Sequence, residues 1–83
     1  MYCYKVGDIV LSLAGRDKKR LFAVVGMADQ NHVYLSDGKS RKTASPKKKK
    51  IKHIKFIKNS EGEFSPADAV VRKILAGVKT SNK

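Results

Sequence analysis

The sequence predicts a mainly β domain, a small barrel or sandwich of short strands followed by one C-terminal amphipathic α-helix. Apolar runs of five to seven residues recur at regular intervals, and residues typical of turns separate them, as in small all-β proteins. After residue 65 the apolar residues change to the spacing of a helix face. With 83 residues the chain has room for one domain with a modest core.

Three apolar runs in the first half of the chain are rich in β-branched residues. We expect strands at residues 8–13, 21–27 and 32–36. Residues 14–17 and 29–31 separate these runs and have the composition of turns. Asp37-Gly38 closes the third run and is a strong signal for a tight turn.

Residues 39–58 carry ten lysines and arginines and no acidic residue. A pure charge block would be disordered, but the apolar residues threaded through 51–57 indicate that this part is fixed to the core. We expect a turn near Lys52-His53 and a closing strand at 54–58. Pro46 excludes a regular central strand at its own position.

The remainder of the chain reads as a polar loop at 59–64, a helix at 65–78 and a frayed tail at 79–83. Ser65 is the expected N-cap, Pro66 the first helical residue and Gly77 the stop signal. One face of this helix is apolar, formed by Ala67, Val70, Val71, Ile74, Leu75 and Val78. That face either packs across an open end of the barrel or docks on a protein partner or a second copy of the chain.

The charge balance points to a polyanionic partner. Nineteen Lys and Arg against seven Asp and Glu give a net charge of +12, which favours binding to phosphate backbones through counterion release. RNA, DNA and an anionic membrane surface all fit this charge. The membrane is disfavoured because the lysine-rich segment lacks an amphipathic helix with bulky anchors.

Several classes of protein and site are excluded by composition and motif. Cys3 is the single cysteine, so no intramolecular disulfide forms, and one Cys with two His is too few ligands for a structural zinc site. No P-loop, paired carboxylates or nucleophile–base arrangement is present, so we expect no enzyme and no cofactor. Without a signal peptide or an apolar span, the chain is expected to be soluble and cytoplasmic, with no membrane partner.

Residues 6–20, followed by the strand segment Ala23-Val24-Val25, resemble a KOW motif. In that family a Gly-Asp start leads into a strand, and a loop glycine, a basic turn and a second strand follow. Residues 14–17, 31–38 and 51–54 look more narrowly like the large-subunit ribosomal protein family L-fourteen-e, of archaeal and eukaryotic type, and its small bacterial KOW-domain relatives.

The resemblance covers roughly residues 5–58 and implies an SH3-like (KOW) β-barrel there, one that binds RNA without catalysis on or near the ribosome. In KOW proteins the loop between the first two strands commonly touches RNA, which here carries over to Gly15, Arg16, Lys18, Lys19 and Arg20. The family often has a glycine just after the basic residue of this turn, and Lys19 takes that place here. This departure puts the loop geometry in question and makes Lys19 a candidate phosphate contact instead of a turn residue.

The residues themselves suggest how RNA would be bound. Arginine can hold a phosphate through two hydrogen bonds or stack on an unpaired base, whereas lysine acts as a point charge. Gly15 is either a turn glycine alone or one whose open backbone also approaches a phosphate. The lysine run 47–50 is expected as a loop that adds affinity without sequence preference, or as a solvated loop that contacts nothing. The RNA-binding candidates are Gly15, Arg16, Lys18, Lys19, Arg20, Tyr34, Arg41, Lys42, Lys47, Lys48, Lys49, Lys50, Lys52 and His53.

The aromatic residues and His53 have alternative roles. Strand alternation directs Val33 and Leu35 to one face and leaves Tyr34 on the other, where it could stack on a base. Phe22 and Phe56 could also stack, but we expect them in the core. His53 is expected to make a hydrogen bond at a turn, or alternatively to contact RNA.

Two other functions stay open beside RNA binding. SH3-like barrels also bind peptides through aromatic-lined grooves, although a chain with no Trp and three Tyr assembles such a groove with difficulty. Nonspecific DNA binding would follow from charge alone.

Overall fold

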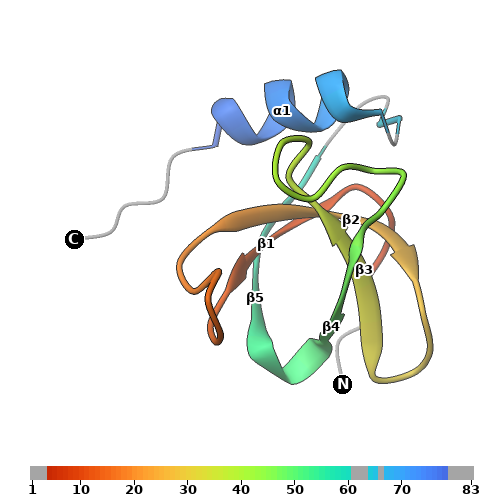
Figure 1. Cartoon of the computed structure of the whole chain (residues 1–83), viewed down its shortest axis with the longest axis vertical. Coiled ribbons are helices and arrows are strands. Elements are labelled where there is room, and N and C mark those ends of the chain that lie inside the picture. The colour runs from red at the N-terminus through yellow and green to blue at the C-terminus, as the bar shows by residue number, and fades with distance from the viewer. Residues whose placement is uncertain (1–3, 61–63, 66, 79–83) are drawn as a thin grey trace.

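The computed structural model describes residues 4–60, 64–65 and 67–78 (Figure 1). Its elements in chain order are β1 (Asp8–Ser12), β2 (Leu21–Met27), β3 (His32–Ser36), β4 (Lys47–Lys50), the 3-10 helix η1 (Ile51–His53), β5 (Ile54–Asn59) and α1 (Asp68–Ala76). The chain is therefore mainly β with one C-terminal helix, as the sequence predicts. The expected tail at 79–83 and the middle of the expected loop at 59–64 lie outside the described residues.

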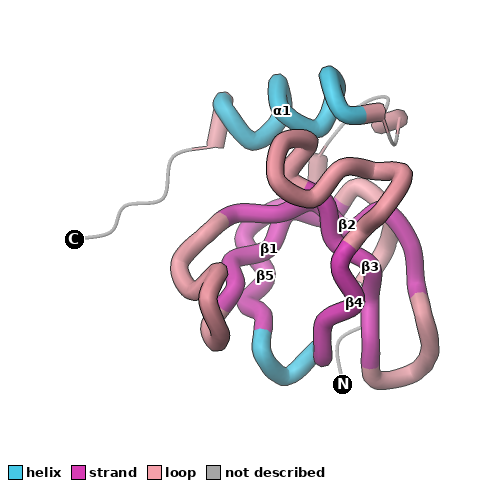
Figure 2. The backbone as a smooth tube through the Cα atoms, viewed as in Figure 1, coloured by secondary structure: helices cyan, strands magenta, loops and turns pink. Residues whose placement is uncertain are grey.

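The strands form one antiparallel sheet in the order β4-β3-β2-β1-β5. Figure 2 shows the sheet curling strongly, with η1 turning the chain from one edge strand, β4, into the other, β5. The turn expected at Lys52-His53 and a strand at the expected 54–58, one residue longer, are thus confirmed. The ladder order leaves the described sheet open, because its edges β4 and β5 are not neighbours in it.

The core lies inside this curled sheet. Its buried cluster consists of Tyr4, Val10, Phe22, Val24, Val33, Leu35 and Ile54, with Ile51 packed against it. Phe22 is 1% exposed, as expected of a core residue, and the alternation in β3 buries Val33 and Leu35 as predicted. The prediction that Phe56 is also core is wrong: Phe56 is 37% exposed. Its ring lies on an edge strand, where it meets Tyr4 at a centroid distance of 6.4 Å but has sheet neighbours on one side only.

The lysine run is not the loop that the sequence suggested. Lys47–Lys50 form β4, paired with β3 in the register Leu35↔Lys47, Tyr34↔Lys48, Val33↔Lys49 and His32↔Lys50. Strand alternation therefore sorts the four lysines onto two faces. Pro46 directly precedes β4, a position at the start of an edge strand that proline tolerates.

The helix is shorter at its N-terminus than predicted. Its N-cap is Ala67, which has an extended backbone and no side-chain cap, so Ser65 is not the N-cap; Pro66 lies outside the described residues. Its last residue is Ala76 and Gly77 is the C-cap, so the predicted stop signal at Gly77 is confirmed, although the helix ends before the predicted residue 78. Val71 is fully buried, and α1 lies across one end of the curled sheet (Figure 1).

Candidate nucleic-acid interface

The loop between β1 and β2 is compact because its own backbone holds it. Lys19 N donates to Ser12 O at 2.7 Å and Arg20 N donates to Asp17 O at 3.0 Å. Gly15 has φ +86° and Lys19 has φ +71°, so both residues occupy the left-handed region. Lys19 is therefore a turn residue, with the backbone conformation that glycine adopts most easily. The loop retains its left-handed turn without a glycine at this position.

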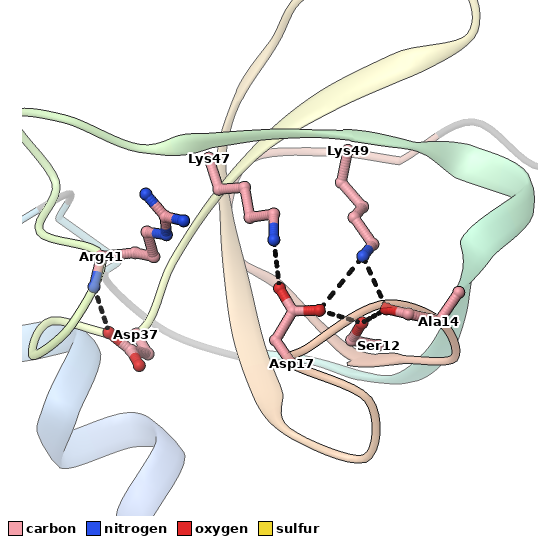
Figure 3. Close-up of polar contacts among 7 residues, drawn as sticks. All are labelled: Ser12, Ala14, Asp17, Asp37, Arg41, Lys47 and Lys49. Atoms are coloured by element: carbon pink, nitrogen blue, oxygen red, sulfur yellow. Dashed lines mark hydrogen bonds and ion pairs between the residues drawn. The ribbon is translucent and has the colours of Figure 1, made fainter.

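A buried carboxylate joins this loop to β4 (Figure 3). Asp17 is 7% exposed. Its Oδ2 accepts a hydrogen bond from Lys47 Nζ at 2.8 Å, and its Oδ1 accepts from Lys49 Nζ at 3.1 Å and from Ser12 Oγ at 2.9 Å. Lys49 Nζ also donates to Ala14 O at 2.8 Å. The sequence separation of 30 and 32 residues between Asp17 and its two lysines makes this a tertiary clamp.

The electrostatics of Asp17 follow from this geometry. Burial alone would raise the pKa of the Asp17 carboxyl, but the hydrogen bonds from Lys47, Lys49 and Ser12 outweigh burial and hold that pKa far below its ordinary value. The carboxylate is therefore charged at neutral pH. Lys49, only 8% exposed, has its ammonium hydrogen-bonded to Asp17 and Ala14, which leaves it less accessible to RNA than the exposed Lys48 and Lys50.

Beside the clamp lies a recess of about 360 Å³ with a basic lining. Arg16, Asp17 and Arg20 come from the first loop, Ser40 and Arg41 from the β3–β4 loop, and Lys47 from β4, with Phe22 behind them. None of the three arginines forms an ion pair with a carboxylate among the described residues. Figure 3 shows the Arg41 side chain extending toward Lys47. The recess thus combines uncompensated guanidinium groups from segments that are distant in sequence.

The β3–β4 loop that carries Arg41 has a defined shape. Asp37 Oδ1 accepts from Lys39 N at 2.8 Å and from Arg41 N at 2.9 Å, and Ser36 Oγ donates to Arg41 O at 2.6 Å. Gly38, the glycine of the predicted turn, has φ +74°. Lys42, which follows Arg41, is exposed on the same loop, as Lys18 is on the β1–β2 loop.

A second candidate surface lies along the outer face of β3 and β4. Tyr34 is half-buried and stands opposite the exposed Lys48, and His32 stands opposite the exposed Lys50. A recess of about 540 Å³ adjoins them, lined by Gln30, Asn31, His32, Lys50, Ile51 and Lys52. His53 is half-buried at the turn, where its backbone carbonyl accepts a hydrogen bond from Leu13 N at 2.8 Å.

Sequence reasoning missed two cations of this surface. Arg72 of α1 and Lys39 help to line a recess of about 380 Å³ together with Lys19 and Arg20. Arg72 Nη1 donates to Gly38 O at 2.8 Å, so the helix is attached to the β3–β4 loop. Helical periodicity places Arg72 away from the apolar face, but no local pattern shows which loop it reaches.

In the part of the chain that the structure describes, no three His, Cys, Asp or Glu residues gather to hold a metal ion. No helix of that part is long and apolar enough to cross a membrane. Comparison of the sequence with protein-family models and with curated proteins gave no match.

Proposed function

We propose that this chain is a non-catalytic RNA-binding protein, built as an SH3-like barrel of the KOW type, that binds structured RNA on or near the ribosome in the cytoplasm. The observation that carries the proposal is the basic recess, where Arg16, Arg20 and Arg41 are brought together with no ion pair to any carboxylate of the described residues. Guanidinium groups in such a site match phosphate oxygens in geometry and charge.

The arrangement of β4 supports the same proposal. Lys47 and Lys49 neutralise Asp17, which removes the negative charge from beneath the surface, while Lys48 and Lys50 stay exposed. The outward lysines lie two residues apart, about 7 Å along a strand. They continue the positive surface toward Tyr34, whose ring gives an unpaired base a stacking partner.

The peptide-binding alternative has less support. A groove for proline-rich peptides needs several exposed aromatic rings side by side. Tyr4 and Phe22 are buried, and Tyr34 lies among lysines on the outer face of β3 and β4. A basic face is therefore better supported than an aromatic cleft.

The test is a titration of the protein against a folded ribosomal RNA fragment and a DNA duplex of equal length, followed by fluorescence anisotropy at several salt concentrations. If about six phosphates are engaged, log K falls with log[salt] with a slope of about −4 to −5. RNA is expected to bind more tightly than DNA at every salt concentration, because A-form shape and 2′-hydroxyls distinguish it. Coinciding RNA and DNA curves would refute RNA recognition and leave nonspecific binding to polyanions.

A further inference from the structure

We propose that the recess formed by Arg16, Arg20, Arg41 and Lys47 is a binding site for a single unpaired nucleotide, which enters with its 5′-phosphate and its base. This inference rests on the proposed function and names the chemical unit that the site takes. It predicts a preference for RNA with a bulged or looped-out nucleotide over continuous duplex.

The size of the recess favours one nucleotide unit. At about 360 Å³ it lies at the lower end of the range for small-molecule sites. A duplex backbone would lie across the rim of such a hollow, because paired nucleotides cannot leave the stack without unpairing. A nucleotide already outside a helix can enter without that cost.

The charge of the recess favours an anion. Its lining has four cationic side chains and one carboxylate, Asp17. Both oxygens of Asp17 are occupied by hydrogen bonds from Lys47, Lys49 and Ser12, so the carboxylate is already compensated. A phosphate would therefore meet the three guanidinium groups with little competition from Asp17.

The presence of three arginines favours a nucleotide over a bare phosphate. One guanidinium binds a phosphate through paired hydrogen bonds, and another can stack its planar face on an exposed base. Arg16 and Arg20 belong to the compact β1–β2 loop, and Arg41 comes from the β3–β4 loop. The site therefore has guanidinium groups from two separate loops, enough for one to bind the phosphate and another to stack on the base.

The experiment compares Arg41→Gln with the control Lys55→Gln, which removes one charge from an exposed position on β5. The Arg41 backbone hydrogen bonds do not need its side chain, so both variants should fold, as circular dichroism would check. Each is titrated with a hairpin RNA that has one bulged nucleotide and with the same hairpin fully paired. We expect Arg41→Gln to weaken binding to the bulged RNA about tenfold, and binding to the paired RNA no more than Lys55→Gln does.

Equal losses for the two variants on both RNAs would overturn the nucleotide site while leaving RNA binding intact. A failure of the parent protein to distinguish RNA from DNA would instead refute the proposed function. A second measurement follows the arginine side-chain NMR signals during addition of a nucleoside 5′-monophosphate, the matching nucleoside or inorganic phosphate. The monophosphate should shift the signals of Arg16, Arg20 and Arg41 at the lowest concentration. An equal response to inorganic phosphate would show an anion site without nucleotide recognition and would overturn the proposal.

Discussion

Replacing Asp17 by Asn tests whether the clamp between the β1–β2 loop and β4 stabilises the fold. The substitution keeps the size of the side chain but removes the charge that compensates Lys47 and Lys49. Removing one partner of a buried ion pair costs about 3–5 kcal/mol, because the other charge stays buried and unpaired. The Lys47 side chain is 26% exposed and can turn toward water, whereas Lys49 is 9% exposed and cannot. We therefore expect Asp17→Asn to lower the free energy of unfolding by about 3 kcal/mol, the lower end of this range.

That loss is large for a domain of this size. Small domains have about 0.05–0.15 kcal/mol of stability per residue, so the variant should lose a substantial part of the total. Each kcal/mol lowers the melting temperature of such a domain by about 4–8 °C, which gives a fall of about 12–24 °C. Urea unfolding followed by circular dichroism measures the change. Asp29→Asn is the control, because the Asp29 side chain is 50% exposed in its pair with His32 and should change stability far less.

The same clamp predicts a pH dependence. The pKa of Asp17 is depressed in the folded state, so its stabilisation is present above the unfolded pKa of about 3.9 and is lost as the pH falls below that value. Stability of the parent protein should therefore fall more steeply below about pH 5 than stability of Asp17→Asn. A loss below about 1 kcal/mol for Asp17→Asn at pH 7, with parallel pH profiles, would refute the buried clamp.

Three further predictions test the loops and the outer face. Lys19→Gly removes the backbone strain of a lysine at φ +71° and should raise the free energy of unfolding by about 0.5–1 kcal/mol. Lys18→Gly removes the same charge and should lower the free energy of unfolding. Thermal melts measure both changes, and equal changes would contradict the strain at Lys19. Gly38→Ala places a Cβ 2.6 Å from a backbone oxygen of α1 at φ +74° and should destabilise the fold by more than about 1 kcal/mol. Gly77→Ala is the control: its Cβ would lie 3.6 Å from the backbone oxygen of Ile74, so the substitution should leave stability unchanged or raise it in the same melts. Tyr34→Leu should weaken binding to single-stranded RNA by about 1–3 kcal/mol and leave duplex binding unchanged, which anisotropy measures; an equal loss on both would argue against stacking.

The sequence predicts the strands well because their signals are local. The bounds of β2 and β3 are the same as those of the apolar runs at 21–27 and 32–36, because period-two burial and turn chemistry act within a few residues. The structure of the lysine run 47–50 does not follow from local signals. These residues form a strand because they pair with β3. Lys49 can be buried because the carboxylate of Asp17, 32 residues earlier in the chain, accepts a hydrogen bond from its ammonium. Composition alone gives all four lysines the same role.

The helix start shows a second limit of local signals. Ser65 has the chemistry of an N-cap, but the helix begins at Asp68, whose Oδ1 accepts a hydrogen bond from Thr43 N at 2.7 Å. That bond engages the Asp68 carboxylate with a loop 25 residues away instead of a local cap. Tertiary contacts of this kind override capping preferences, which are worth only about 1 kcal/mol.

The contacts of α1 with the β3–β4 loop also give the helix a role in the proposed site. Asp68 and Arg72 both bond to the β3–β4 loop, and Gly38 of that loop fits against the helix backbone with no room for a side chain. Because the same loop carries Arg41 into the basic recess, the helix helps to fix a guanidinium that it does not touch. An arginine whose loop is already ordered loses less conformational entropy when it binds an anion. The helix therefore contributes to the proposed RNA site by preorganising the loop, in addition to covering the end of the sheet.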